Sequence, residues 1–320
     1  MFADDTNLFY SHKNLDNLVA TVNQELQKIS LWLRINKLSL NIKKTHFILF
    51  HFRQKKISSP VAIYIDKNKL EQVKETKFLG VIINENLTWS DHIDVVSNKC
   101  SKNLGIIRKL QKTVPRNILV TLYSTLIYPY LNYCNIAWAS QPTTFLEKLY
   151  RVQKKAMRVI THSAWNTHSL PLFKTLNFLT IYDINKLQTA CFVYSAIHSI
   201  LPPTFSHYFH LNSLIHEHNT RSSSKFHSVY HSTSLRSYTV RIHAPKIWNA
   251  LTAEIINAPT VYSFKKNINS HCSVNILKSI LYNKVNIIKF CLICCCCLLH
   301  MFPLYIVKFC SRYNQISNCN

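Results

Sequence analysis

The sequence predicts an α+β protein, in which a small antiparallel sheet with helices is followed by a mostly α-helical region. Residues 1–90 contain several short apolar runs and one amphipathic segment. In residues 91–215, apolar residues recur mainly at helical spacing. The 320 residues contain 48% hydrophobic residues, enough to build one large domain or two ordinary ones.

The first part alternates helix and strand. Residues 14–35 predict an amphipathic helix that Asn14 can cap, with its apolar stripe packed under the sheet. The run His46–Phe50 predicts a short strand. Residues 61–83 predict a β meander that turns at Asp66–Lys69 and ends in an apolar strand over Phe78–Ile83.

Helical periodicity dominates the next part. Residues 91–112 predict a helix with a basic polar side, and residues 115–140 predict a buried helix pair. Further helices are expected at 145–160, 169–177 and 180–200. Residues 217–240 are rich in Ser and His and predict a loop or linker.

The charge is strongly basic, with 38 Lys and Arg against 14 Asp and Glu, a formal net charge of +24. Such a surplus favours polyanionic partners, either nucleic acid or an anionic membrane surface. Only two glycines are present, Gly80 and Gly105, and no phosphate-binding glycine loop or dinucleotide fingerprint occurs. We therefore expect no small-molecule cofactor.

The 11 cysteines do not indicate a secreted disulfide framework, because no signal peptide is visible. A reducing compartment, nucleus or cytoplasm, is expected for the main body. Several histidines lie between residues 207 and 231, but their spacing does not fit a paired zinc finger. We interpret them as solvated or base-stacking side chains.

Two adjacent carboxylates, Asp4 and Asp5, lie between apolar residues at the start of the chain. A tight turn between strands formed by Phe2-Ala3 and Leu8-Phe9 would bring both carboxylates to one end of a strand pair. There they could bind a hard cation such as Mg²⁺. The alternative is an exposed Asp-Asp turn, because Asp favours turns for local reasons.

The box Phe2-Ala3-Asp4-Asp5 resembles the aromatic-Ala-Asp-Asp box of reverse transcriptases. Lys44-Thr45 ahead of a strand and the Phe78-Leu79-Gly80 element also match that family. The similarity continues through the segments Leu87–Ile93, Ile127–Cys134, Val152–Ala156 and Ala244–Asn249. Over residues 1–270, the chain resembles the second half of a non-LTR retrotransposon polymerase of the jockey or CR1 type.

The resemblance implies a truncated reverse-transcriptase palm with the primer grip at 1–90, and a helical thumb and post-thumb region at 91–215. A loop-rich C-terminal segment of the element follows at 216–270. Asp4 and Asp5 would hold Mg²⁺, and Lys44 would lie beside the incoming nucleotide. An RNA template and a DNA primer are the implied partners. The residues expected to bind nucleic acid are Phe78, Leu79, Gly80, Lys99, Lys102, Arg108 and Lys109.

The family also uses fingers and an Asp from an upstream strand, and neither is found in this sequence. Metal-assisted nucleotidyl transfer needs the full set of carboxylates. We therefore expect a fragment with little or no polymerase activity alone. Two alternatives stay open: a non-catalytic basic protein that binds RNA or DNA, and a C-terminally anchored membrane protein.

The tail, residues 271–320, is hydrophobic and rich in Cys. Its apolar run Ile287–Val307 is just long enough to span a bilayer. It could be a membrane anchor, a buried helix, or translation beyond the natural end of the element. We favour the last, because the resemblance stops near residue 270; a true anchor would place the protein in a membrane.

Overall fold

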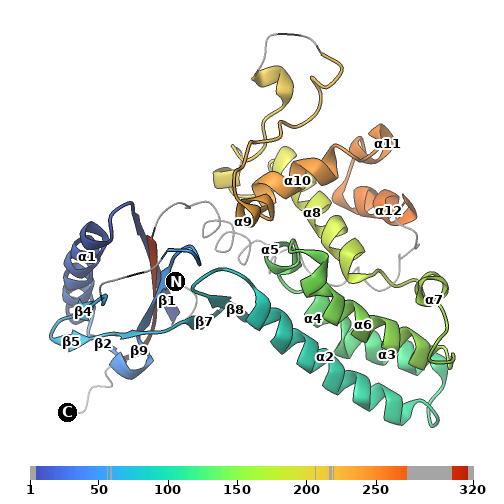
Figure 1. Ribbon diagram of the computed structural model, residues 1–320, viewed down its shortest axis with the longest axis horizontal. Coiled ribbons are helices and arrows are strands. Elements are labelled where there is room, and N and C mark those ends of the chain that lie inside the picture. The colour runs from blue at the N-terminus through green and yellow to red at the C-terminus, as the bar shows by residue number, and fades with distance from the viewer. Residues whose placement is uncertain are drawn as a thin grey trace. The chain divides into compact units, whose positions relative to one another are not determined.

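The computed structural model describes residues 5–55, 57, 60–205, 207–215, 218, 220–271 and 305–315; at 5–6, 234–235, 269–271 and 305–315 it describes the backbone alone. The chain divides into two compact units. Unit 1 comprises Met1–Asp91 with His300–Asn320, and unit 2 comprises His92–Leu299. The mixture of helices and small sheets is consistent with the α+β class (Figure 1).

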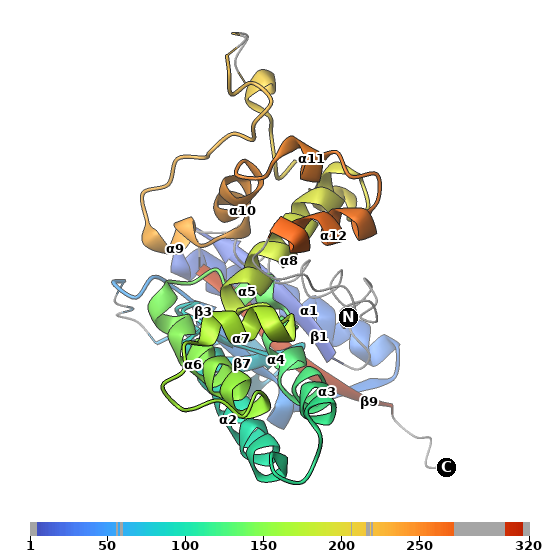
Figure 2. The ribbon, with the colours of Figure 1, turned by 90° about the vertical axis from the view of Figure 1, so that its right-hand side faces the viewer.

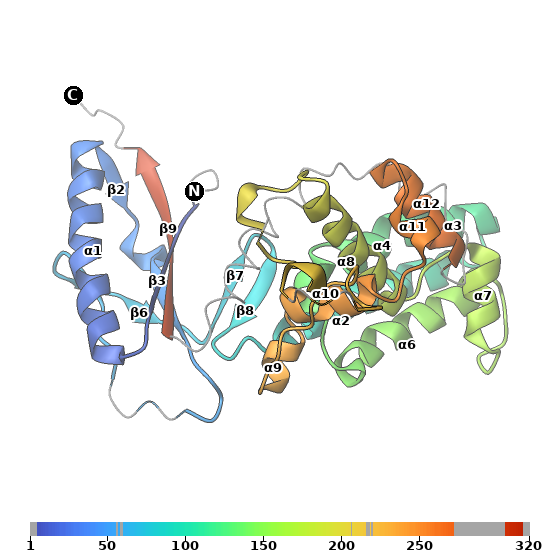
Figure 3. The same ribbon diagram turned by 90° about the horizontal axis from the view of Figure 1, so that it is seen from above.

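Unit 1 contains a five-stranded sheet in the order β1-β9-β3-β6, with β2 paired to β9. Strand β9 runs antiparallel to β1, β2 and β3, whereas β3 and β6 are parallel. Strands β1 and β3 therefore run in the same direction, with β9 between them (Figure 3). The bounds are β1 Asp5–His12, β2 Leu38–Leu40, β3 His46–Phe50, β6 Glu71–Gln72 and β9 Tyr305–Gln315.

Helix α1 (Leu15–Ile35) covers one face of this sheet (Figure 3). The Asn14 side chain accepts hydrogen bonds from the backbone N–H groups of Asp16 at 2.7 Å and Asn17 at 3.2 Å, which confirms the predicted cap. The expected packing under the sheet is also confirmed. The core of unit 1 includes Leu18, Val22 and Leu26 of α1, Phe47 and Leu49 of β3, and Ile63, Ile65 and Leu70.

Two hairpins follow β3. The first pairs β4 (Tyr64–Ile65) with β5 (Asn68–Lys69), and the second pairs β7 (Glu75–Phe78) with β8 (Val81–Asn84). The prediction of one strand over residues 78–83 is therefore wrong. Leu79 and Gly80 have φ angles of 45° and 84°, and two positive φ angles in a two-residue loop are typical of the type I′ hairpin turn.

Unit 2 is helical. The predicted helices at 91–112, 145–160, 169–177 and 180–200 are confirmed within a few residues at each end. The predicted pair over 115–140 is three helices instead, because Pro129 lies in the first turn of α4, where proline is tolerated, and Cys134 has a left-handed φ of 49°. The bounds are α2 Ser90–Leu110, α3 Arg116–Leu126, α4 Tyr128–Asn132, α5 Asn135–Trp138, α6 Thr143–Ile160, α7 Ser169–Leu176, α8 Ile181–Ile197, α9 Ser234–Ser237, α10 Val240–Trp248, α11 Ala253–Ile256 and α12 Val261–His271.

A buried glutamine joins three of these helices. The Gln153 amide nitrogen donates to the Tyr123 hydroxyl at 3.0 Å and to the Leu179 carbonyl at 3.2 Å. Its carbonyl oxygen accepts from the Ile181 N–H at 2.8 Å. This network links α3, α6 and the start of α8, and α8 in turn packs against α10 and α12 (Figure 2).

Within the described ranges, no helix is both long enough and apolar enough to cross a bilayer. The apolar run Ile287–Val307 lies outside these ranges, except for its last three residues, which begin β9.

Candidate functional site

The second residue of the acidic pair, Asp5, begins β1. Asp4 lies outside the described residues, and Asp5 is the first residue of the strand, with only its backbone described. The prediction of a turn between Ala3 and Leu8 is wrong for Asp5–Asn7, because these residues already belong to β1 and pair with β9. The strand register sets Asp5 opposite Arg312 of β9.

Lys44 reaches the same end of the sheet from a different element. It is the exposed last residue of the short 3₁₀ helix Ile42–Lys44, directly before β3. Asn7 and His46 both pair with Cys310 of β9, so the starts of β1 and β3 are level with each other. Asp5 and Lys44, each two residues before these positions, therefore lie at one end of the sheet. Two strand spacings, roughly 10 Å, separate their strands.

Among the described residues, Glu71 of β6 is the carboxylate whose strand pairing can be compared with this end of the sheet. Glu71 of β6 pairs with His46 on the other side of β3, three strand spacings or roughly 14 Å from β1. Mg²⁺ binds its oxygen ligands at about 2 Å, so Glu71 cannot share an ion with Asp5. Among the residues described, no group of three or more His, Cys, Asp or Glu could hold a metal.

The β7–β8 hairpin is held against β1 and β3. The Phe78 ring, almost fully buried, meets the Phe9 ring of β1 edge-on at 6.2 Å between centroids. The His46 ring nitrogen Nε2 lies 2.8 Å from the Thr76 hydroxyl, which ties the start of β3 to β7. Phe78 is therefore part of the core. The tip of the hairpin offers half-buried Leu79 and exposed Gly80 to a partner.

The connection from this hairpin to α2 holds a polar network that sequence reasoning missed. The Asn84 amide donates to the Thr88 hydroxyl and to the Asp91 carboxylate, both at 2.7 Å, and its oxygen accepts from the Thr88 N–H at 2.9 Å. Leu87 and Trp89 are buried with φ angles of 53° and 59°. Left-handed backbone costs about 1–2 kcal/mol per residue, so the network stabilises a strained connection. The only sequence signal was the spacing of Asn84, Thr88 and Asp91.

Helix α2 presents a basic face to solvent. The predicted residues Lys99, Lys102, Arg108 and Lys109 are all exposed, and the helical period places them away from the buried stripe. That stripe consists of His92, Ile93, Val96, Cys100, Leu104 and Ile107. Residues 95–112 contain no Asp or Glu, so no acid within the helix neutralises this face. The Lys99 ammonium lies over the Tyr130 ring, 5.3 Å from its centroid.

Helix α6 uses its basic residues differently. The Glu147 carboxylate forms ion pairs with Arg151, whose Nε lies 3.5 Å from Oε1, and with Lys154, whose Nζ lies 3.2 Å from the same oxygen. The Arg158 guanidinium Nε donates to the Thr167 carbonyl at 2.9 Å. Arg151, Lys154 and Arg158 therefore have partners within unit 2, and we take the basic face of α2 as the candidate surface for a polyanion.

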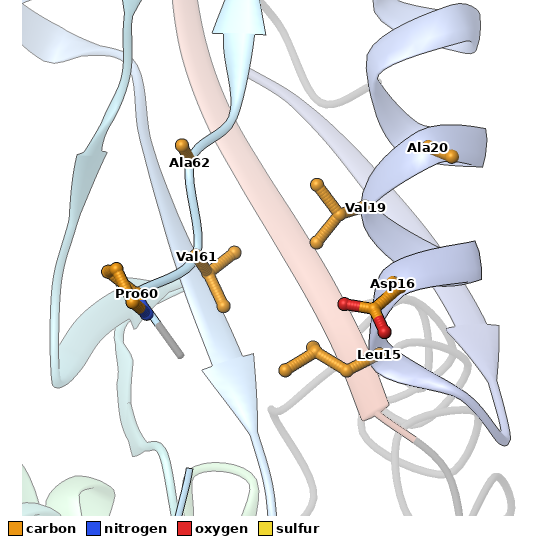
Figure 4. Close-up of a pocket in the computed structure, with 7 residues that line it drawn as sticks. All are labelled: Leu15, Asp16, Val19, Ala20, Pro60, Val61 and Ala62. Carbon is orange, nitrogen blue, oxygen red and sulfur yellow. The ribbon is translucent and has the colours of Figure 1, made fainter. Parts of the chain in front are cut away.

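An open pocket of about 320 Å³ lies between α1 and residues 60–62 (Figure 4). Asp16 is the one charged residue among the seven that line it, and the others are Leu15, Val19, Ala20, Pro60, Val61 and Ala62. A small-molecule site usually needs several converging polar groups. This lining does not supply them.

Comparison with known proteins links the chain to the RNA-directed DNA polymerases of transposons. The matches are curated relatives, and they support the reverse-transcriptase family. No family model matches the chain, and no solved structure matches it.

Two of these relatives come from Drosophila melanogaster. The chain is 24% identical over 190 residues, 58% of its length, to the probable RNA-directed DNA polymerase from transposon X-element. It is 24% identical over 187 residues, 57% of its length, to the corresponding protein from transposon BS. In both cases, the chain spans about a fifth of the length of the relative.

Proposed function

We propose that this chain is part of the RNA-directed DNA polymerase of a non-LTR retrotransposon of the jockey or CR1 type. Unit 1 corresponds to the part of the palm that carries the acidic pair. The β7–β8 hairpin is the primer grip, and α2 is the thumb helix that follows the phosphate backbone. The template is RNA, the primer is DNA, and Mg²⁺ is the metal of the complete enzyme.

One observation carries this proposal: Asp5 and Lys44 come to the same end of one sheet although 38 residues lie between them. Nucleotidyl transfer requires carboxylate-bound metal beside the triphosphate, and a lysine nearby can neutralise charge on that triphosphate. The starts of β1 and β3 lie at one end of the sheet, two strand spacings apart, and this arrangement suits the division of roles.

Primer extension tests the catalytic part. Purified chain is given Mg²⁺, a primed RNA template and deoxynucleotides. We expect little or no extension, because the described residues near Asp5 lack a third carboxylate. Extension that disappears in Asp4→Ala and Lys44→Ala, but persists in Lys67→Ala at the exposed β4–β5 turn, would contradict the expected inactivity and support the assigned roles.

A second function, binding of RNA or DNA without catalysis, rests on the unneutralised basic face of α2. Lysines that contact phosphates release counterions, so affinity falls steeply as salt rises. The double variant Lys102→Gln/Lys109→Gln should bind more weakly and lower the salt slope by roughly 1.4–1.8. Filter binding across a salt series measures both quantities.

The matched control is Lys186→Gln/Lys246→Gln, which removes the same charge from exposed positions on α8 and α10. It should retain most of the affinity and the original salt slope. Equal losses in the two double variants would show that net charge alone attracts the nucleic acid, and would remove α2 from the proposal.

A further inference from the structure

We propose that the space between β1 and β3 is a strand-binding groove, and that residues 305–315 are its separable ligand. The inference concerns how unit 1 is completed, and it does not depend on the proposed polymerase function. It rests on strand direction, strand pairing and sequence alternation.

The direction of the strands creates the groove. Strands β1 and β3 are parallel to each other and are connected through α1, with one strand width left between them. The strand in that space comes from the far end of the chain, after residues 272–304, which lie outside the described ranges. The chain segments that form the two walls therefore do not supply the strand between them.

The pairing of β9 is extensive. It forms eight residue pairs with β1, five with β3 and three with β2. In the described sheet, β9 is the one strand that pairs with β1, and β3 otherwise has only two pairs with β6. Without β9, both walls would expose unpaired backbone N–H and C=O groups, and such edges recruit extended chains.

The sequence of β9 matches the two faces of the groove. Phe309 is level with Leu8 and Phe47, and Val307 is level with Tyr10 and Leu49. These four wall residues belong to, or pack against, the core under α1. Directly paired residues share a face of the sheet, so Val307 and Phe309 stand on the covered face.

The alternate positions of β9 stand on the other face, and they include the basic residues Lys308 and Arg312. The same face carries Ile306 and Cys310 of β9 and is level with the buried Ile48 and Phe50 of β3. The ligand class is therefore an extended peptide with mainly apolar residues on the α1 face and both apolar and basic residues on the other.

Cleavage of the full-length protein tests the inference. A protease site placed within residues 272–304 of the full chain separates β9 from the rest after folding. We expect the C-terminal fragment to remain bound through gel filtration as a complex with the mass of one chain. A fluorescent peptide of residues 305–315 should then exchange into the cleaved protein, as measured by anisotropy.

Matched peptides define what is recognised. Lys308→Pro removes a backbone donor, and Phe309→Lys places charge on the covered face; each should weaken binding at least tenfold. Cys310→Lys, on the other face, should change binding less than threefold. Equal binding of all four peptides would overturn the proposed groove.

Release of the fragment, failure of the peptide to bind, or a dimer held together by residues 305–315 would each overturn the assignment. Hydrogen exchange on the uncut protein gives a reading that is independent of how cleavage affects folding. Slow exchange in both 305–315 and 46–50 supports the groove, and fast exchange throughout 305–315 contradicts it.

Discussion

The two glycines of this chain occupy opposite kinds of position. Gly105 lies in the middle of α2 on the exposed side, and a Cβ added there would meet nothing within 4 Å. Gly80 lies in the hairpin turn with φ 84°. Glycine costs roughly 0.5–1 kcal/mol relative to Ala inside a helix, whereas a positive φ favours glycine.

The substitution Gly105→Ala should therefore raise the free energy of unfolding by about 0.5–1 kcal/mol. Gly80→Ala should lower it by about 1 kcal/mol or more, because Ala is strained in left-handed backbone. Urea denaturation of both variants measures the two changes in the free energy of unfolding. Changes of the same sign would contradict the two assigned environments.

Leu79 is the strained partner of Gly80 in the turn, with φ 45°. Asn-Gly is the preferred pair for a type I′ turn, so Leu79→Asn should stabilise unit 1 by about 0.5–1 kcal/mol. Thermal unfolding of the variant shows whether its stability rises or falls. A loss of stability would show that the half-buried Leu79 side chain contributes more by packing than the turn costs in strain.

Burial of His92 predicts a pH dependence of stability. Burial, with a smaller effect from the Lys99 charge, lowers the pKa of His92 from its ordinary 6.5 to about 4. Between these values the unfolded chain binds a proton that the folded chain does not. The contribution of neutral His92 to the free energy of unfolding should be complete above pH 6.5. It should fall toward pH 4, by up to about 3 kcal/mol.

Urea titrations at several pH values test this dependence, with His92→Gln as the comparison. The variant should lose most of the slope between pH 6.5 and 4. Some slope should remain, because burial and then Lys246 also lower the pKa of His243. An unchanged slope in His92→Gln would assign the effect to other groups.

Among the secondary-structure elements, α6 carries a buried glutamine, Gln153, whose side chain makes three hydrogen bonds within unit 2. Substitution of Gln153 by Leu keeps the size but leaves the Tyr123 hydroxyl, the Leu179 carbonyl and the Ile181 N–H without this partner. An unsatisfied buried group costs about 1–3 kcal/mol. We expect a loss of roughly 3 kcal/mol or more by urea denaturation.

Gln27→Leu is the control, because Gln27 is exposed on α1 and should change stability by less than about 0.5 kcal/mol. If Gln153→Leu were equally mild, the three helices would be joined by apolar packing alone.

Helix positions could be predicted from sequence because apolar spacing is local information. Asn14 caps α1 as expected, and α2, α6, α7 and α8 begin and end near the predicted residues. The hairpin at Leu79-Gly80 could not be predicted from the same pattern, because a continuous apolar run is equally typical of one strand. The Gln153 network depends on how three helices meet, and no spacing rule encodes that.

Across the whole molecule, the sequence pattern did not predict β9. Residues 305–315 of the tail pair with three strands of unit 1. Pairing between the two ends of a chain depends on tertiary contacts, and periodicity within each segment does not reveal it. The shared end of Asp5 and Lys44 also depends on this pairing, since β9 sets the level of β1 against β3.

The proposed function predicts where nucleic acid meets the protein. In that proposal the β7–β8 hairpin is the primer grip, so a primer that ends near the acidic pair would contact it. A DNA primer with a photoreactive group on its 3′-terminal nucleotide, annealed to an RNA template, measures this directly. We expect crosslinks to residues 75–84. Salt-sensitive binding with all crosslinks at residues 217–240 or on α6, and none at the hairpin, would contradict it.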